Sequence, residues 1–187
     1  MKYRRWISTL ALLAATSAAL AAPGPIAGVT MPDTITIEGK SLKLNGMGLR
    51  TKVVFKVYVA GLYLEAPSKD AAAVLAADQV RSIRLAVLRS LKGSQVMEAI
   101  EEGFEKNSKA QIAALKPRLD QLGKMVPNVE KGDDIVMTYV PGKGTVVSVK
   151  GGEKGVIEGK DFADALFSVW LGANPVQEDL KKELLRG

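Results

Sequence analysis

The stretch from about Lys52 to Glu65 is the feature that most constrains the fold of this chain. Read as an extended strand, it places apolar side chains on both faces: Val53, Phe55, Val57 and Val59 on one, and Val54, Tyr58 and Ala60 on the other. A strand that is apolar on both faces is covered on both sides. We therefore expect one long central strand, at least partly covered on each face. Gly61 interrupts the alternation, which predicts a bulge or a close approach of another backbone.

The rest of the chain switches between strand and helix patterns. Alternating apolar residues predict strands or hairpins, and apolar residues at helical spacing predict helices. We expect hairpins at residues 34–44 and 135–150, the second turning at Pro141-Gly142, strands at 80–91 and 156–157, and a loop at 45–48. Helices are expected at 70–77, 94–107, 112–122, 160–171 and 175–185. Ser94 is the expected N-cap of its helix, Pro117 an expected break, and Pro175 the expected first position of the last helix. This order predicts an α+β fold: a large, mainly antiparallel sheet with a layer of helices.

The first residues have the pattern of a secretory signal peptide. A basic start at Lys2, Arg4 and Arg5 precedes the apolar run 6–20, and Ala19-Leu20-Ala21 offers the small-x-small cleavage pattern. An uncleaved anchor is the alternative, and the cleavage pattern argues against it. We expect a signal peptide at 1–21, a Gly/Pro-rich lead-in at 22–33 and one domain at 34–187. No integral membrane span is expected after removal of the signal.

Composition excludes several classes of site. The chain has no cysteine and no histidine, so disulfides, Cys/His metal sites and a histidine general base are ruled out. We expect no metal and no cofactor. Without the three basic residues of the signal, 23 basic residues face 20 acidic ones, a net charge of +3. Such a small charge gives no case for nucleic acid as a partner.

Two side chains are candidates for a binding or catalytic role. Arg50 follows the glycine-rich 45–48 segment, and its guanidinium could hold a carboxylate or phenolate through paired hydrogen bonds. The alternative is a surface arginine at a strand edge. Tyr58 lies in the middle of the expected central strand, so its hydroxyl needs a partner or a cavity. The alternative is a core tyrosine bonded to backbone. Arg84 and Arg89 are better explained as solvent-facing strand residues.

Three separated motifs stand out along the chain. They are Leu44–Lys52 followed by Phe55–Leu64, then Leu91–Gln95 entering a Glu-rich helix, and Phe167–Gly172 followed by Pro175 and Leu180–Leu185. Together and in this order they resemble the bacterial chalcone isomerase-like family. The resemblance spans the chain from about Thr34 to its end. It implies an open-faced β-sandwich with a ligand cleft between sheet and helices. Plant members that are enzymes close a flavanone ring, whereas related members lack that activity and some bind fatty acids.

The resemblance carries functional residues over only in part. Arg50 resembles the arginine that stabilises the ring-closing oxyanion in the enzymes. Tyr58 stands where they have a threonine, Val96 where they have a tyrosine, and Gly103 where they have an asparagine. A further hydroxyl position falls near Ser168 or Val169. The arginine is therefore kept, while the polar groups that recognise a polyphenol are not.

From these observations we expect an exported periplasmic protein that binds a small apolar anion, such as a fatty acid, without catalysis. Arg50 would pair with the head group, assisted by Tyr58, and Val96 and Ile100 would line the tail. One alternative is an isomerase or lyase acting on a periplasmic enone or phenolic substrate, with Arg50 as electrophile and Tyr58 as proton donor. Another is a structural or assembly accessory protein. The oligomeric state stays open.

Overall fold

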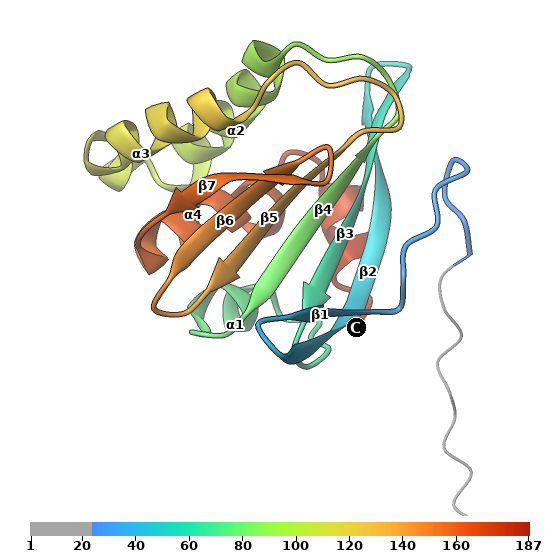
Figure 1. Cartoon of the computed structure of the whole chain (residues 1–187), viewed down its shortest axis with the longest axis horizontal. Coiled ribbons are helices and arrows are strands. Elements are labelled where there is room, and N and C mark those ends of the chain that lie inside the picture. Colours follow the sequence, from blue (N-terminus) through green and yellow to red (C-terminus); the bar gives the residue numbers. More distant parts are fainter. Residues whose placement is uncertain (1–23) are drawn as a thin grey trace, which may run out of the picture.

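The computed structural model describes residues 24–187, and one curled sheet of seven strands dominates it (Figure 1). The strands are neighbours in chain order, and each pair is antiparallel. They are β1 Thr34–Ile37, β2 Lys40–Lys52, β3 Phe55–Leu64, β4 Arg81–Val87, β5 Asp134–Val140, β6 Gly144–Val149 and β7 Gly152–Ile157. The predicted antiparallel α+β architecture is confirmed. The predicted signal peptide at 1–21 lies outside the described residues.

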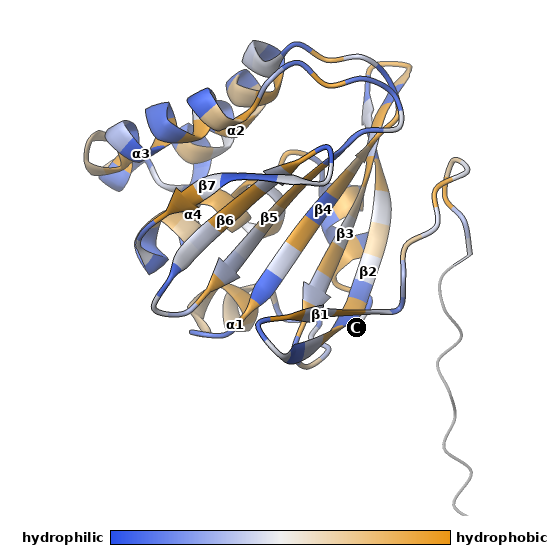
Figure 2. Ribbon diagram, viewed as in Figure 1, coloured by the Kyte–Doolittle hydropathy of each residue, from blue (hydrophilic) through white to orange (hydrophobic). Residues whose placement is uncertain are grey.

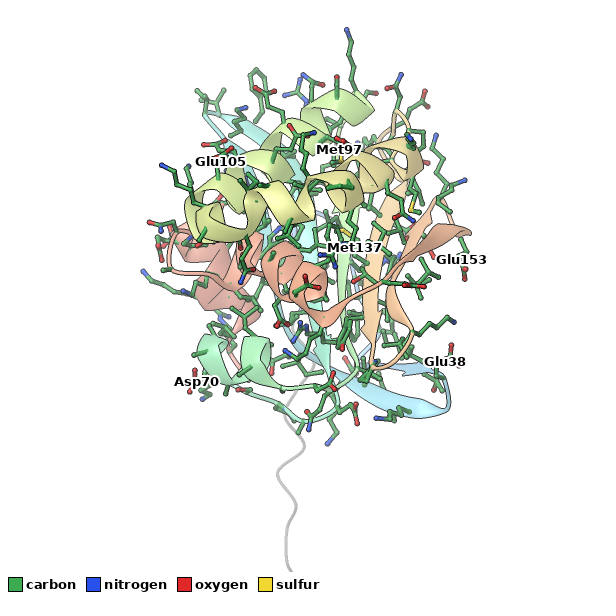
Figure 3. All side chains as sticks on the ribbon, turned by 90° about the vertical axis from the view of Figure 1, so that its left-hand side faces the viewer. Glu38, Asp70, Met97, Glu105, Met137 and Glu153 are labelled. Atoms are coloured by element: carbon green, nitrogen blue, oxygen red, sulfur yellow. The ribbon has the colours of Figure 1, made fainter. Side chains whose placement is uncertain are left out.

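The helices gather on one face of the sheet and form the main core with it. They are α1 Ala71–Ala76, α2 Gly93–Asn107, α3 Ile112–Met125, α4 Lys160–Leu171 and α5 Glu178–Leu184, with a short 3-10 turn Lys109–Gln111 before α3. α4 is buried on almost every side, and Phe162 packs its ring 5.7 Å from that of Phe104 on α2. In Figure 3, Met97 on α2 and Met137 on β5 lie between the helices and the sheet, whereas Glu105 lies at the periphery.

The other face of the sheet is covered only in part. Met31, from the Gly/Pro-rich lead-in, is buried against it, and the Tyr63 hydroxyl donates to the carbonyl of Pro32 at 2.9 Å. A side chain at Gly61 would put its Cβ only 2.2 Å from the Met31 sulfur. The bulge or backbone approach expected at Gly61 is therefore wrong, because the glycine makes room for the Met31 side chain, and Ile26, Val29 and Met31 pack the lead-in against the sheet.

The expected strand from Lys52 to Glu65 is wrong at its start. Lys52 ends β2 and pairs with Phe55, the first residue of β3, so Val53 and Val54 form a two-residue turn. A turn normally carries Gly, Asn, Asp or Pro, and this one has none, which is why its valines extended the apparent strand.

The loop expected at residues 45–48 is also wrong, because these residues belong to β2. A Cβ on Gly46 would lie 2.1 Å from the carbonyl oxygen of Glu183, and one on Gly48 would lie 2.9 Å from the Leu180 side chain. The glycines are therefore there to let α5 lie directly against the strand, not to form a turn.

Two helix starts and one expected break differ from the predictions. α2 begins at Gly93, before Ser94, and α3 runs through Pro117 without a break. Pro117 is exposed, so water can serve the backbone carbonyl that the proline leaves without a donor. α5 begins at Glu178, three residues after Pro175. The preceding segment is held outside the helix, because the N–H of Val176 donates to the Val169 carbonyl at 2.7 Å.

Candidate functional site

A cavity of about 410 Å³ lies between the sheet and the helices. Its floor comes from β3, β4 and β5, and its walls come from α2 and α4. The apolar lining is Val53, Phe55, Val57, Leu85, Val87, Leu91, Val96, Ala99, Ile100, Ile135, Val169, Trp170 and Val176. Its exposed members lie at the β2–β3 turn, so the cavity opens to solvent between that turn and α2.

Arg50 and Tyr58 supply polar groups to this mostly apolar lining. They are direct partners in the antiparallel register of β2 and β3, so their side chains stand on the same face of the sheet. Both side chains are half-buried. A cationic group and a phenol are thereby placed next to each other beside an apolar chamber.

The side-chain amide of Gln177, just before α5, fixes the end of β2 and the guanidinium beside it. Its oxygen accepts from the Thr51 N–H at 3.0 Å and from Arg50 Nη1 at 3.2 Å, and its nitrogen donates to the Leu49 carbonyl at 3.2 Å. Arg50 also donates to the carbonyl of Thr51. Because glycines at 46 and 48 bring α5 close to the strand, Gln177 can reach these groups.

The hydroxyl of Tyr58 accepts a hydrogen bond of 3.0 Å from the indole N–H of Trp170 on α4. Burial raises the pKa of the Tyr58 phenol, and the Trp170 bond and the charge of Arg50 offset this rise only in part. The phenol is therefore protonated at neutral pH. Its O–H has no acceptor among residues 24–187 and is available to a ligand.

Val96 and Ile100 lie one turn apart on α2 and both line the cavity. Ile100 is buried and Val96 is half-buried. The four residues predicted from the sequence, Arg50, Tyr58, Val96 and Ile100, are thus brought together around one chamber.

The other positions considered for a polar ligand contact are occupied by packing. Gly103 is buried at the crossing of α2 and α4, where an added Cβ would lie 2.7 Å from the Val169 side chain. Ser168 donates to the Ala165 carbonyl of its own helix at 2.6 Å and does not line the cavity, whereas Val169 does. Of these positions only Val169 lines the cavity, and its side chain is apolar.

Charged side chains that were not predicted as site residues surround the mouth of the cavity. Arg89, expected to face solvent, lines it with its guanidinium 4.4 Å from the centre of the Phe55 ring, and Lys52 lines it from the end of β2. Glu98 and Glu102 line it from α2. The hydrogen bond from Lys106 is the largest cause of a lowered pKa at Glu102, with smaller contributions from Lys52 and Arg50.

The remaining candidates have structural roles away from the cavity. Arg84 is on the other face of the sheet and pairs with Asp134 at 3.1 Å. Within residues 24–187, no group of three or more acidic side chains is placed to hold a metal ion. Nor does any helix in that range have the length and apolarity needed to cross a membrane.

The arrangement suits an elongated apolar molecule with one anionic end. Arg50 can donate to a carboxylate from its guanidinium, and the neutral phenol of Tyr58 can add a second donor. A cavity of this size is within the usual range of small-molecule sites. The chain has no histidine or cysteine, so a Ser-His or Cys-His pair cannot form in this lining.

Comparison with known proteins agrees with this fold. The family model described as chalcone isomerase-like matches residues 23–186. A crystal structure of a fatty-acid binding protein from Arabidopsis thaliana superposes with a TM-score of 0.69 at 18% sequence identity, covering 85% of this chain and 92% of that chain. At that identity the likeness concerns the fold. The search of curated proteins gave no match.

Proposed function

Because the chain belongs to the chalcone isomerase-like family, we propose that its cleft binds a small apolar anion, with fatty acids as the leading class. One observation carries the proposal: Arg50 and the neutral phenol of Tyr58 are register partners at the edge of a chamber whose lining is mostly apolar. The fatty-acid binding protein that shares the fold supports the choice of ligand class. Binding is proposed to be the whole activity, without catalysis.

The energetics favour an ionised head group at Arg50. A guanidinium that faces an apolar cavity is poorly solvated, and a carboxylate brings it a compensating charge and directed hydrogen bonds. The tail would then lie along Val96 and Ile100 on α2, where burial of its methylene groups contributes about 0.8 kcal/mol each. Charge sets the orientation of the ligand, and apolar burial supplies most of the affinity.

An isomerase or lyase is the competing proposal, and one observation favours it. A protonated phenol beside a guanidinium is a pair that could deliver a proton and stabilise an oxyanion. The apolar Val96 and the packed Gly103 argue against it, because they offer no group to orient a polyphenol.

A purely structural role, with the cleft as a relic, is the third proposal. It predicts side chains that fill the space between sheet and helices. A chamber of about 410 Å³ remains there, and this volume supports binding instead.

We also propose that the protein is exported to the periplasm. The support comes from the sequence alone: the basic start, the apolar run 6–20 and the Ala19-Leu20-Ala21 pattern. N-terminal sequencing of protein recovered from the periplasm should begin near Ala22 or Pro23. An intact Met1 on that protein would contradict export by a cleaved signal.

Native mass spectrometry tests the proposed binding function. Protein is isolated from the cells that make it and transferred intact to the gas phase, and the bound lipids are then extracted and identified. The expected result is one molecule of a fatty acid or a similar single-chain anion per chain. Protein that carries no such molecule, and takes none up when decanoic acid is supplied, would overturn the proposal.

A further inference from the structure

The β2–β3 turn presents three consecutive apolar side chains to solvent. Val53 is 88% exposed, Val54 78% and Phe55 55%, and they are the large apolar side chains left exposed in the described residues. The turn projects beyond the sheet at the top of Figure 1 and is coloured as hydrophobic in Figure 2. An apolar cluster of this kind on a surface marks an interaction site more often than a single exposed residue does.

The backbone of the turn is strained in a way that packing does not explain. Val53 has φ of 58°, in the left-handed region, which is sterically unfavourable for a β-branched residue. Glycine or asparagine at this position would relieve the strain in a two-residue turn. An apolar side chain is thus held in an unfavourable conformation and points into solvent.

Basic side chains flank the β2–β3 tip, which is formed by Val53, Val54 and Phe55. Lys52 and Lys56 lie on either side of it and are exposed, and the Arg89 guanidinium stacks over the Phe55 ring at 4.4 Å. The acidic groups nearby, Glu98 and Glu102, belong to α2 across the cavity mouth, and Glu102 is paired with Lys106 at 2.7 Å. The tip itself therefore combines apolar and cationic groups.

The tip is also part of the rim of the cavity. Lys52, Val53 and Phe55 line the mouth, whereas Val54 does not. Any surface that covers the tip therefore also faces the entrance to the chamber.

We infer that the β2–β3 tip docks on the surface of a membrane that contains anionic lipids. Val53, Val54 and Phe55 enter the interface, and the neighbouring lysines and Arg89 contact the head groups. Membrane affinity of this type grows with the apolar area buried and with the attraction between basic residues and anionic lipids. The cavity mouth then faces the bilayer. This docking does not depend on which ligand the cavity takes.

Co-sedimentation with vesicles tests the inference, using protein as recovered from the producing cells. One set of vesicles is phosphatidylcholine alone, and the other contains equal parts of phosphatidylcholine and phosphatidylglycerol. Wild type should bind the anionic vesicles more tightly, and added salt should weaken that binding. Val54→Asp should weaken it by at least about tenfold, because it removes a valine that enters the bilayer interface on docking and adds a negative charge. Lys56→Gln should weaken it about fivefold on anionic vesicles and hardly at all on neutral ones.

Val53→Asn separates docking from folding. Asparagine tolerates the left-handed conformation, so this variant should be at least as stable as wild type and yet bind vesicles about tenfold more weakly. Thr36→Asp, an exposed position on β1 at the opposite end of β2, is the matched charge control and should bind vesicles like wild type. All variants must have the same N-terminus by intact mass.

The outcomes are distinct. Equal vesicle binding by wild type, Val53→Asn and Val54→Asp would overturn the inference. Wild type that binds neither kind of vesicle would also overturn the inference. If that protein still takes up decanoic acid in solution, the proposed function is unaffected. A dimer that Val54→Asp converts to a monomer would assign the tip to self-association and overturn membrane docking.

Discussion

Arg50 and Tyr58 face each other across β2 and β3, and each is held by a residue from far along the chain. Gln177 accepts from Arg50 at 3.2 Å, and Trp170 donates to Tyr58 at 3.0 Å. The two polar groups at the cavity are therefore oriented before any ligand arrives. Preorganised donors lower the entropy cost of binding, so both supporting residues matter for affinity.

Replacement of Arg50 should affect binding far more than folding. In Arg50→Ala, Gln177 still accepts from the Thr51 N–H, so the free energy of unfolding should stay within about 0.5 kcal/mol of wild type. Affinity for a medium-chain fatty acid should fall at least about tenfold, because the anionic head loses its partner. Arg50→Lys should rescue only part of the loss, since an ammonium lacks the planar two-bond contact. Thermal unfolding and calorimetric titration of delipidated protein measure both effects, and equal affinities would remove Arg50 from the site.

Gln177→Glu should weaken binding while leaving Arg50 in place. The new carboxylate can still accept from Thr51 and forms an ion pair with Arg50, so it competes with the head group of the ligand, but it cannot replace the amide hydrogen bond to the Leu49 carbonyl. We expect affinity for decanoic acid to fall by about tenfold or more, and added salt to recover part of it. Glu178→Gln, the next residue along, is the matched control and should bind normally. An unchanged affinity in Gln177→Glu would show that Arg50 does not meet the head group.

Tyr58→Phe should weaken binding by several fold and also destabilise the fold. The ligand loses the phenol as a donor, and the Trp170 N–H loses its acceptor in a buried place, which costs about 1–3 kcal/mol. Titration and chemical denaturation of the variant measure the two losses. A stability equal to that of wild type would indicate that the Trp170 bond is not formed in solution.

The raised pKa of Tyr58 predicts a pH dependence with a definite sign. Its phenol has a higher pKa in the folded protein than the ordinary tyrosine value of 10.0, so the stability it contributes is complete below about pH 10. That contribution is lost as the pH rises above 10 and through the folded value. Tyr63 and Tyr139, both with pKa raised to about 12, act in the same direction. Wild type should therefore lose stability above pH 10 more steeply than Tyr58→Phe, and parallel curves would contradict this assignment.

Chalcone isomerisation should be absent. Val96 and the packed Gly103 leave no polar group on α2 to orient the substrate, and each missing oriented donor costs about 10²–10³ in rate. A spectrophotometric assay at neutral pH should show loss of chalcone absorbance no faster than in buffer. Rapid loss that disappears in Arg50→Ala would favour the isomerase proposal.

The sequence predicted the elements whose patterns are local. The β5–β6 hairpin and α4 were predicted at almost their observed bounds, because a Pro-Gly turn and an uninterrupted apolar helix pattern mark them. The β2–β3 turn was missed because Val53 and Val54 continue the alternation of the strands around them. Gly46 and Gly48 were misread because they serve a contact with α5, which is far away in the sequence. The neighbouring hydrogen bond from Asn45 to the Leu184 carbonyl joins residues 139 positions apart.

The sequence predicted residues that line the cavity, but not the residues that hold Arg50 and Tyr58 in place. Arg50, Tyr58, Val96 and Ile100 follow from motifs and periodicity, and all four line the cavity. Gln177 and Trp170 were out of reach, because they meet the site only through the packing of α4 and α5 on the sheet. The polar contacts that orient a site depend on tertiary structure, whereas the apolar residues of its wall can be predicted from local periodicity.

Calorimetric titration of delipidated wild type with decanoic acid and with 1-decanol tests the central claim most directly. The two ligands share a chain and differ at the head, so their comparison isolates the role of Arg50 and Tyr58 from that of the apolar lining. We predict saturable binding of one decanoate per chain, at least about tenfold tighter than 1-decanol, with that preference lost in Arg50→Ala. Failure of decanoate to bind, or equal affinity for the acid and the alcohol in wild type, would contradict an anion-binding cleft.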